Sequence, residues 1–247
     1  MTKGIRQTDS GSDFFTTPAE SYTFSATQRV ADLTVSSSGE LSGFIKMIYT
    51  GDPAIRWRLR NLEGDAASLE REIRTSVENL VPSGVELKVT SIEKLDDYEQ
   101  PFSANLEVKG TLGSSTGKRV LLPADIFAAN VKPAFPHEKR DIPVYFEYPR
   151  ITQDAVRIKF PPSLAIESLP TEGKSNLEKS IVYRLTAESA PNSFTVHRTY
   201  ALGDIVFPPE QYATFRAFYS KMEIKDQESV VLTSATAAAS KPVPSGN

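Results

Sequence analysis

The chain has 247 residues, no cysteine, two histidines and a formal net charge of −3. The missing thiols exclude disulfide bonds and cysteine nucleophiles, and two histidines leave little material for a metal site. Hydrophobic residues make up 39% and charged residues 24%, which is usual for a globular protein, so neither nucleic acid nor an anionic membrane is an expected partner. The sequence contains no run of about eighteen apolar residues, so we expect no membrane span.

The two ends of the chain have the composition of flexible segments. Residues 1–20 are rich in Ser, Thr, Asp and Gly and predict a flexible lead-in, with Phe14 and Phe15 able to hold it against a surface. No apolar run follows Lys3 and Arg6, so this start lacks the pattern of a signal peptide. Residues 234–247 are mostly Ala, Ser, Thr and Pro, which predicts a disordered tail.

Residues 21–132 predict an α+β domain with the order β-β-α-α-β-β-β. Residues 28–35 and 41–49 alternate apolar and polar side chains around a Ser-Ser-Gly-Glu turn, as a β-hairpin does. Asp52-Pro53 then begins a helix whose apolar stripe we expect to be Ile55, Leu59 and Leu62. A strand remains the alternative there, because residues 55–60 also alternate strictly.

A second helix follows Gly64-Asp65, and strands complete this domain. The helix carries Leu69, Ile73, Val77 and Leu80 on one stripe. The strands are expected at 85–93, 102–111 and 118–122. Helices grouped between antiparallel strands are typical of α+β folds.

The prolines of residues 123–143 place a domain junction before a second domain at 133–233. Short strands separated by turns indicate a β-sandwich there, with one helix near 208–222. The strands are expected at 144–148, 155–160, 165–168, 179–187, 193–200 and 229–233. The predicted fold class is therefore mainly β with α+β character, in two domains.

Two short motifs resemble catalytic signatures but depart from them. Gly113-Ser114-Ser115-Thr116-Gly117-Lys118-Arg119 has three residues between its glycines where a phosphate-binding loop has four, and no Ser or Thr follows the lysine. A strand follows it rather than a helix, so we interpret the segment as a hairpin tip. His137-Glu138 begins like a zinc-protease motif, but position 141 is Asp141 rather than histidine. We interpret His137 and His197 as ordinary structural residues.

Three clusters have a structural and a functional interpretation. The acidic runs 96–99 and 223–228 indicate solvated turns and helix ends, whereas a glycosidase needs two carboxylates across a cleft. The arginines at 56, 58, 60, 71 and 74 alternate with acidic residues and indicate a mixed-sign helix surface rather than a nucleic-acid site. We expect the aromatic face at Tyr212, Phe215, Phe218 and Tyr219 to dock its helix onto the sheet, with a ligand platform as the alternative.

A set of short motifs gives the chain a family resemblance. The set resembles the C-terminal region of bacterial transglutaminase-like proteins that begin with the domain DUF3857. It comprises residues 49–51, 135–144, 148–149, 154–161, 167–170, 207–219 and 226–232. The catalytic core of that family uses Cys, His and Asp, and this chain has no cysteine, so no catalytic residue carries over.

The resemblance implies a non-catalytic accessory or scaffold region of an envelope protein. It implies a periplasmic or extracellular location, and a partner that is a transglutaminase-like catalytic domain or another envelope protein. A free-standing carbohydrate- or protein-binding module is the alternative, and a two-carboxylate hydrolase is a third hypothesis. We expect no enzymatic activity, assign no catalytic, metal-binding or cofactor-binding residue, and leave the ligand and the oligomeric state open.

Overall fold

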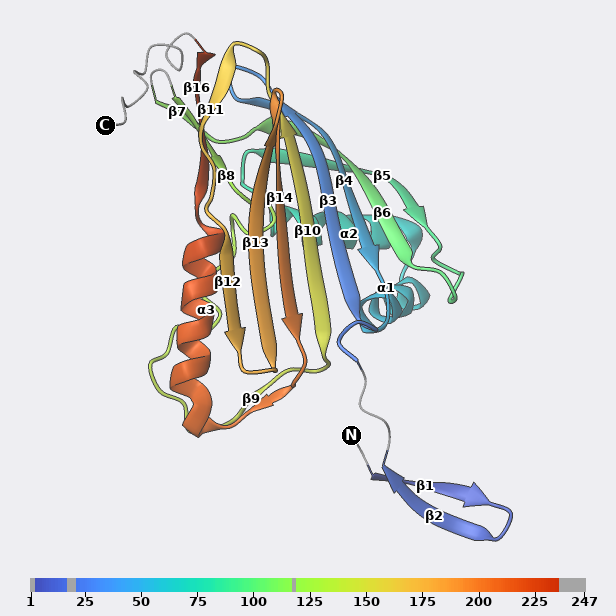
Figure 1. The fold of residues 1–247 in the computed structure, drawn as a ribbon. Coiled ribbons are helices and arrows are strands. Elements are labelled where there is room, and N and C mark those ends of the chain that lie inside the picture. Colours follow the sequence, from blue (N-terminus) through green and yellow to red (C-terminus); the bar gives the residue numbers. More distant parts are fainter. Residues whose placement is uncertain (1–2, 17–20, 117–118, 236–247) are drawn as a thin grey trace.

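The structure is a computed structural model that describes residues 3–16, 21–116 and 119–235 (Figure 1). Most of the predicted tail at 234–247 lies outside these ranges. The predicted lead-in contains an antiparallel hairpin of β1 (Lys3–Thr8) and β2 (Gly11–Thr16), which the sequence did not predict. Phe14 is 83% exposed, so its ring does not hold this hairpin against the rest of the described chain.

The first predicted hairpin and both predicted helices are present. The hairpin consists of β3 (Ala26–Val35) and β4 (Glu40–Tyr49), and α1 (Asp52–Glu63) and α2 (Ala66–Glu78) follow it. Gly51 precedes α1 with a φ of 59°, and a Cβ at this position would lie 2.6 Å from the carbonyl oxygen of Phe24. A side chain would therefore disturb the start of α1.

The two helices differ in whether their aliphatic stripe faces the core. Leu69, Ile73 and Val77 of α2 are buried, as predicted. The helix α1 forms as predicted, but its predicted apolar stripe does not face the core, because Ile55, Leu59 and Leu62 are 45%, 52% and 71% exposed. The buried residues of α1 are Ala54, Trp57 and Arg58.

Trp57 explains the orientation of α1. Its indole ring lies 6.0 Å from the ring of Tyr49 and 6.4 Å from that of Phe102, measured between centroids. A large aromatic side chain gains more from burial than the smaller aliphatic ones on the other face. The helix therefore turns Trp57 toward the sheet and leaves the aliphatic stripe outside.

The remaining elements are mostly strands. The first unit continues with β5 (Val85–Glu93), β6 (Phe102–Thr111), β7 (Ser114–Thr116) and β8 (Arg119–Pro123). The second contains β9 (Val144–Tyr145), β10 (Arg150–Lys159), β11 (Leu164–Ser168), β12 (Gly173–Leu177), β13 (Ile181–Ala190), β14 (Ser193–Leu202), β15 (Val206–Phe207), the 3-10 turn η1 (Pro209–Gln211), α3 (Tyr212–Asp226) and β16 (Ser229–Ser234). The fold class, mainly β with α+β character, is confirmed.

Strands of both predicted domains lie in the same eight-stranded sheet, in the order β12-β13-β14-β10-β3-β4-β6-β5. β10 pairs in parallel with β3, and the other neighbours are antiparallel. β10 satisfies the backbone groups on the edge of β3 that β4 leaves unpaired. The sequence predicted these strands but not the pairing of β10 with β3.

A smaller sheet, in the order β11-β16-β8-β7, also joins the two predicted domains. β8 belongs to the first and pairs with β16 of the second, with Leu122 opposite Val230. Residues 124–143, which connect β8 to β9 along the chain, form no helix or strand. Ile126 and Phe127 of this segment are nevertheless fully buried. A continuous hydrophobic cluster therefore spans the place where the prolines indicated a junction.

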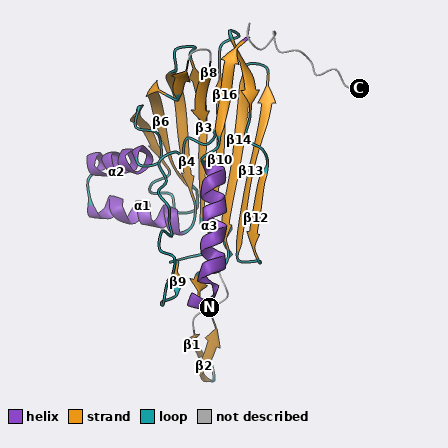
Figure 2. Cartoon of the chain, turned by 90° about the vertical axis from the view of Figure 1, so that its left-hand side faces the viewer, coloured by secondary structure: helices purple, strands orange, loops and turns teal. Residues whose placement is uncertain are grey.

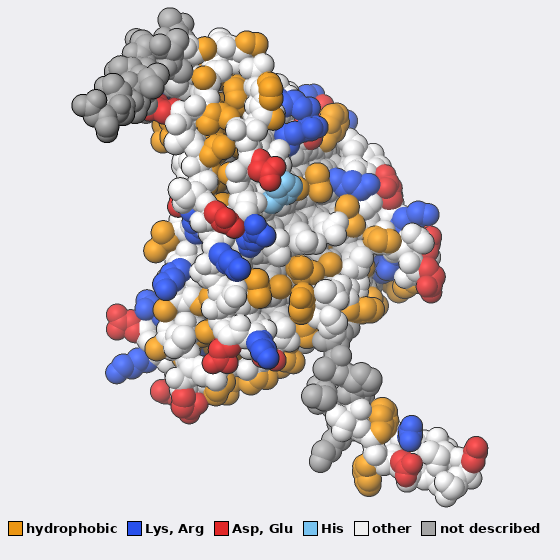
Figure 3. Space-filling model, viewed as in Figure 1, with side chains coloured by type: hydrophobic (Ala, Val, Ile, Leu, Met, Phe, Trp, Pro, Cys, Tyr) orange, Lys and Arg blue, Asp and Glu red, His pale blue; other side chains and the backbone are white. Residues whose placement is uncertain are grey.

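The helices and the smaller sheet lie toward one face of the large sheet, as the side view shows (Figure 2). The other face is turned to the viewer in the space-filling picture and carries charged, polar and hydrophobic side chains (Figure 3). No helix within the described residues is long and apolar enough to cross a membrane.

Candidate functional site

The described part of the segment that resembles a phosphate-binding loop is a hairpin. β7 and β8 pair antiparallel, with Thr116 opposite Arg119, which confirms the interpretation as a hairpin tip. Gly117 and Lys118 lie outside the described residues. Arg119 makes two hydrogen bonds of 2.6 Å to the carboxylate of Glu167, so its guanidinium has a structural role.

The two histidines are exposed and belong to different regions. His197 lies on β14 and is exposed between the buried residues Val196 and Arg198, so it points to the outer face of the sheet. His137 lies in the irregular segment 124–143, and its backbone oxygen accepts a hydrogen bond of 2.8 Å from the Tyr212 hydroxyl. Within the described residues, no group of three or more histidine or acidic side chains is arranged to hold a metal ion.

The acidic turn at residues 96–99 surrounds a buried arginine. Arg58 of α1 is 5% exposed and donates to the backbone oxygens of Asp97, Gln100, Lys94 and Leu95, at 2.6, 2.8, 3.0 and 3.1 Å. These bonds fasten the turn to α1. Arg58 therefore contributes to the fold and not to a basic surface.

The aromatic face of α3 docks the helix, as predicted. Tyr212, Phe215, Phe218 and Tyr219 are each at most 6% exposed. Phe135 packs edge-on against Phe215 and Tyr219, with centroids 4.6 and 4.7 Å apart. Because these rings are buried, they cannot provide an open platform for a ligand.

A row of buried charges crosses the inner face of the large sheet. Arg29 on β3 and Arg198 on β14 lie opposite Asp154 on the central strand β10. Arg29 donates two hydrogen bonds to Asp154, of 2.5 and 2.7 Å. Arg198 lies 3.5 Å from Asp154 and donates two hydrogen bonds, of 2.7 and 2.8 Å, to Asp226 of α3. The row therefore fastens α3 to three strands.

Asp154 and Asp226 both have arginine partners inside the protein. Burial raises the pKa of Asp154, but the charge and hydrogen bonds of Arg29, together with the charge of Arg198, outweigh it and hold that pKa below its usual value. Asp226 also accepts a hydrogen bond of 2.7 Å from the hydroxyl of Tyr183. The carboxylate oxygens of Asp154 and Asp226 therefore accept hydrogen bonds from side chains of the protein itself.

Asp125 lies next to this row and differs from its neighbours. It is fully buried, and its Oδ1 accepts a hydrogen bond of 2.9 Å from the backbone of Phe127, whereas Oδ2 has no hydrogen-bond partner among the described residues. Burial, followed by the negative charge of Asp154, raises the pKa of Asp125 to about 8. At neutral pH the side chain therefore carries a proton.

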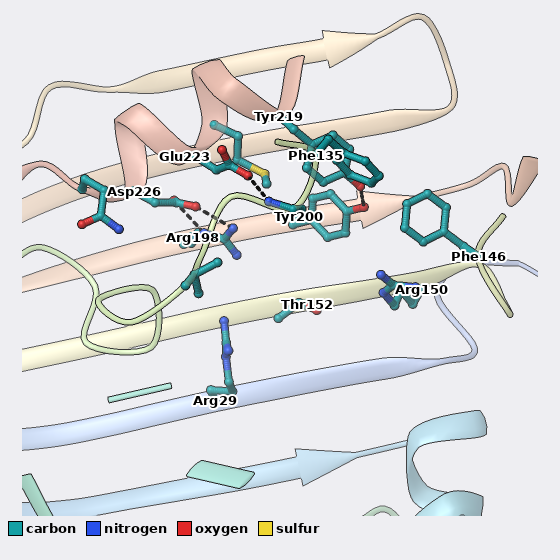
Figure 4. A pocket seen from close by; sticks show the side chains of 14 residues that line it. Arg29, Phe135, Phe146, Arg150, Thr152, Arg198, Tyr200, Tyr219, Glu223 and Asp226 are labelled. Carbon is teal, nitrogen blue, oxygen red and sulfur yellow. Dashed lines mark hydrogen bonds and ion pairs between the residues drawn. The ribbon is translucent and has the colours of Figure 1, made fainter. Parts of the chain in front are cut away.

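A pocket of about 290 Å³ opens beside the charge row (Figure 4). Its floor is formed by strands β3, β10 and β14, through Arg29, Thr152, Arg198 and Tyr200. One wall is the α3 face of Tyr219, Met222, Glu223, Asp226 and Gln227. Val131, Ala134 and Phe135 cover it from the irregular segment, and Phe146 and Arg150 form one end.

Residues 129–143, which we name the strap, hold this cover in place on α3. The backbone nitrogen of Ala134 donates to Glu223 at 2.9 Å, and Arg216 donates to the backbone oxygen of Phe135 at 3.1 Å. Phe135 lies among the aromatic rings of α3 and 6.5 Å from the ring of Phe146. These contacts hold the strap against α3, and each of the two segments forms a wall of the pocket.

Two tyrosine hydroxyls of the pocket form a hydrogen-bonded pair. The hydroxyls of Tyr200 and Tyr219 are 2.5 Å apart. Burial raises the pKa of Tyr200, and burial together with the neighbouring Tyr200 raises that of Tyr219. Both phenols stay protonated at neutral pH, so they act as hydrogen-bond partners rather than as nucleophiles.

Sequence reasoning assigned no site residue and missed this pocket. Arg29, Asp154 and Arg198 carried a usable signal, because each is in phase with the buried residues of its own strand. Asp154 precedes Val156 and Ile158 at the two-residue spacing of one strand face. A charged residue in a buried phase needs a partner, but the sequence does not say which strands are neighbours.

Known proteins match only part of this chain. Residues 118–232 match the model of DUF3858, described as a domain of unknown function with a solved structure. A crystal structure of a candidate protease from Parabacteroides distasonis has 12% sequence identity and a TM-score of 0.41, over 48% of this chain and 24% of that protein. No curated protein matches the sequence. The chain thus spans about a quarter (24%) of that solved structure and carries a DUF3858 match at residues 118–232.

Proposed function

We propose that this chain is a non-catalytic accessory region that packs against a transglutaminase-like catalytic domain in the bacterial envelope. The observation that carries the proposal is the exposed apolar stripe of α1. Ile55, Leu59 and Leu62 follow one another at helical spacing and are 45%, 52% and 71% exposed. A helix of a globular protein normally turns such a stripe inward, so an outward stripe marks a surface for another polypeptide.

The arrangement of ionisable groups supports a structural role for the interior. Asp154 and Asp226 have arginine partners, and Asp125 holds a proton at neutral pH. A two-carboxylate hydrolase needs acids that face a substrate across a cleft. Asp125 and Asp154 are 0% and 3% exposed, so these two carboxyl groups do not face a substrate across an open cleft.

The periplasmic or extracellular location belongs to the same proposal and rests on the family resemblance. The alternative, a carbohydrate-binding module, draws no support from the α3 aromatics, because these rings are buried. Protein contact therefore remains the better interpretation of the exposed apolar surface.

A pull-down with a transglutaminase-like catalytic domain encoded in the same genome tests the proposal. The wild-type chain should retain that domain, and Leu59→Asp should lose it, because a charge in the centre of the stripe opposes apolar burial. Ile224→Asp is the matched control: Ile224 is an aliphatic residue on α3 and is 72% exposed. This control should bind as the wild type does.

Two results would contradict the proposal. If the wild-type chain does not bind the catalytic domain, the chain is not its accessory region. If the purified chain alone hydrolyses a peptide, amide or glycan, and a single side-chain replacement abolishes that activity, the chain is an enzyme.

A further inference from the structure

We infer that the pocket beside the charge row binds a small carboxylate with an apolar body, and that Arg150 holds the carboxylate. Nothing in the accessory role requires this pocket, so the inference stands apart from the proposed function. The inference depends on four features of the pocket. These are a cation without an acidic partner, an uneven distribution of charge, apolar walls, and a volume that fits a small acid.

Arg150 is the available cation. Arg29 and Arg198 also line the pocket, but each donates two hydrogen bonds to a buried aspartate. No carboxylate of the described residues lies within ion-pair distance of Arg150, which instead contacts the rings of Phe146 and Tyr148, at 5.1 and 5.9 Å from the ring centroids. The planar donor fork of a guanidinium fits a carboxylate with two parallel hydrogen bonds.

Phe146 and Tyr148 help to prepare this cation for binding. A guanidinium that lies over aromatic rings loses freedom before the ligand arrives. Arg150 is also fixed at the start of β10, opposite Leu202 in the antiparallel pair with β14. The strand therefore fixes the backbone of Arg150, and the two rings position its guanidinium.

The pocket has a charge polarity that orients an anion. Figure 4 shows Arg150 at one end, beside Phe146, with Asp226 and Arg198 toward the other. Glu223 lies on the α3 wall and carries a carboxylate that accepts a hydrogen bond from the strap. An anionic ligand is repelled by Glu223 and attracted by Arg150, so its carboxylate lies at the Arg150 end.

The walls between the two ends are apolar and aromatic. Phe135 and Phe146 come from the irregular segment and its continuation, and Met222 comes from α3. Thr152 and Tyr200 on the floor, and Tyr219 on the α3 wall, add neutral hydroxyl groups. A ligand therefore needs an apolar body next to its charged group, which favours a hydrophobic acid over phosphate.

The volume limits the ligand to the size of a single residue. At about 290 Å³ the pocket lies just below the range for small-molecule sites, which begins at about 300 Å³. A free hydrophobic acid and the C-terminal residue of a peptide present the same chemistry to this site. The experiment below separates these two sources.

Isothermal titration with matched probes tests the inference. N-acetyl-L-phenylalanine carries the carboxylate of a peptide C-terminus, N-acetyl-L-phenylalaninamide lacks it, and 3-phenylpropionate represents a free acid. The acetylated acid should bind at least about tenfold more tightly than the amide, as expected for a charge-assisted guanidinium pair. Tighter binding of the acetylated acid than of 3-phenylpropionate identifies a peptide terminus as the source, and the reverse order identifies a free acid.

Variants locate the binding. Arg150→Gln should weaken binding of the acids at least about tenfold and leave the amide unchanged. Arg157→Gln is the matched control, because Arg157 is on the same strand but on the outer face, where it pairs with Asp32. Glu223→Gln, which can still accept the bond from Ala134, should strengthen binding of the acids by removing a repelling charge.

Three results would overturn the inference. The first is equal affinity for the acid and the amide, and the second is equal weakening by Arg150→Gln and Arg157→Gln. The third is the absence of binding for both acids at millimolar concentration. If Arg150→Gln does not fold, as judged by circular dichroism, Glu223→Gln decides the question, and an unchanged affinity in that variant would also count against the inference.

Discussion

Two ion pairs join the same two strands, on opposite faces of the sheet. On the inner face, Arg29 of β3 binds Asp154 of β10, and on the outer face Asp32 of β3 binds Arg157 of β10. The side chains of the inner pair are 10% and 1% exposed, whereas those of Asp32 and Arg157 are 40% and 50% exposed. The chemistry is the same with the charges exchanged, so burial alone distinguishes the two pairs.

The difference shows how position gives an ion pair its role. Water screens the outer pair, and Lys159 gives Asp32 a second partner at 2.9 Å. The inner pair lies in the core, where a charge left alone has no water to stabilise it. The inner pair therefore constrains the structure, whereas the outer pair contributes to a polar surface.

The largest expected effect is the loss of the inner guanidinium. Arg29→Met should lower the free energy of unfolding by about 3–5 kcal/mol, because Asp154 then remains buried with only the weaker contact to Arg198. Urea unfolding followed by circular dichroism measures this loss. Arg157→Met removes the same group from the outer face and should have a much smaller effect, and equal losses would show that burial does not separate the pairs.

The next effect is a pH dependence from Asp125. The pKa of Asp125 is about 8 in the folded chain, against 3.8 for an unperturbed aspartate. Between these two pH values the native state therefore binds a proton that the unfolded chain has lost. The contribution of protonated Asp125 to the free energy of unfolding is fully present below about pH 4 and is lost as the pH rises through about 8. The lowered pKa of Asp154 acts in the opposite sense and only in more acidic solution.

Asp125→Asn should remove this dependence, because an amide resembles the protonated acid and keeps the bond from Phe127. Urea unfolding between about pH 5 and about pH 9 should show wild-type stability falling more steeply than that of the variant. Parallel profiles would mean that Asp125 does not titrate in this range.

The smallest effect is expected on the outer face. Hydrogen bonding to Arg157, despite some opposing burial, lowers the pKa of Asp32. Asp32→Asn should destabilise the chain slightly at low ionic strength, and salt at about 0.5 M should abolish the difference from wild type. The matched buried variant, Arg29→Met, should keep its loss in salt. A salt-resistant loss in Asp32→Asn would contradict the comparison.

The local elements were largely predictable from the sequence because their signals are local. Alternation predicted β3, β4, β13 and β14, and the spacing of Leu69, Ile73 and Val77 predicted α2 with its buried face. β12 was missed because Gly173–Leu177 is short and has no apolar alternation. The hairpin at Lys3–Thr16 was missed because its composition indicates flexibility.

The candidate site could not be predicted in the same way. Its residues come from β3, β10, β14, α3 and the strap, and these segments meet only in the folded chain. Arg150 resembles any charged residue at the start of a strand. Only the folded structure shows that Arg29 and Arg198 each have an aspartate partner, whereas Arg150 contacts aromatic rings instead.

The sequence by itself determined the mainly β composition, the positions of most strands and helices, and the absence of thiol chemistry. Tertiary structure decided that β10 lies beside β3, that Trp57 rather than Leu59 faces the core, and that a pocket forms beneath the strap. The physical reason is the range of each interaction. Periodicity and turn propensity act between neighbours in the chain. The pairing of β10 with β3 and the buried ion pair instead join residues that are far apart in the sequence, such as Arg29 and Asp154, which are 125 positions apart.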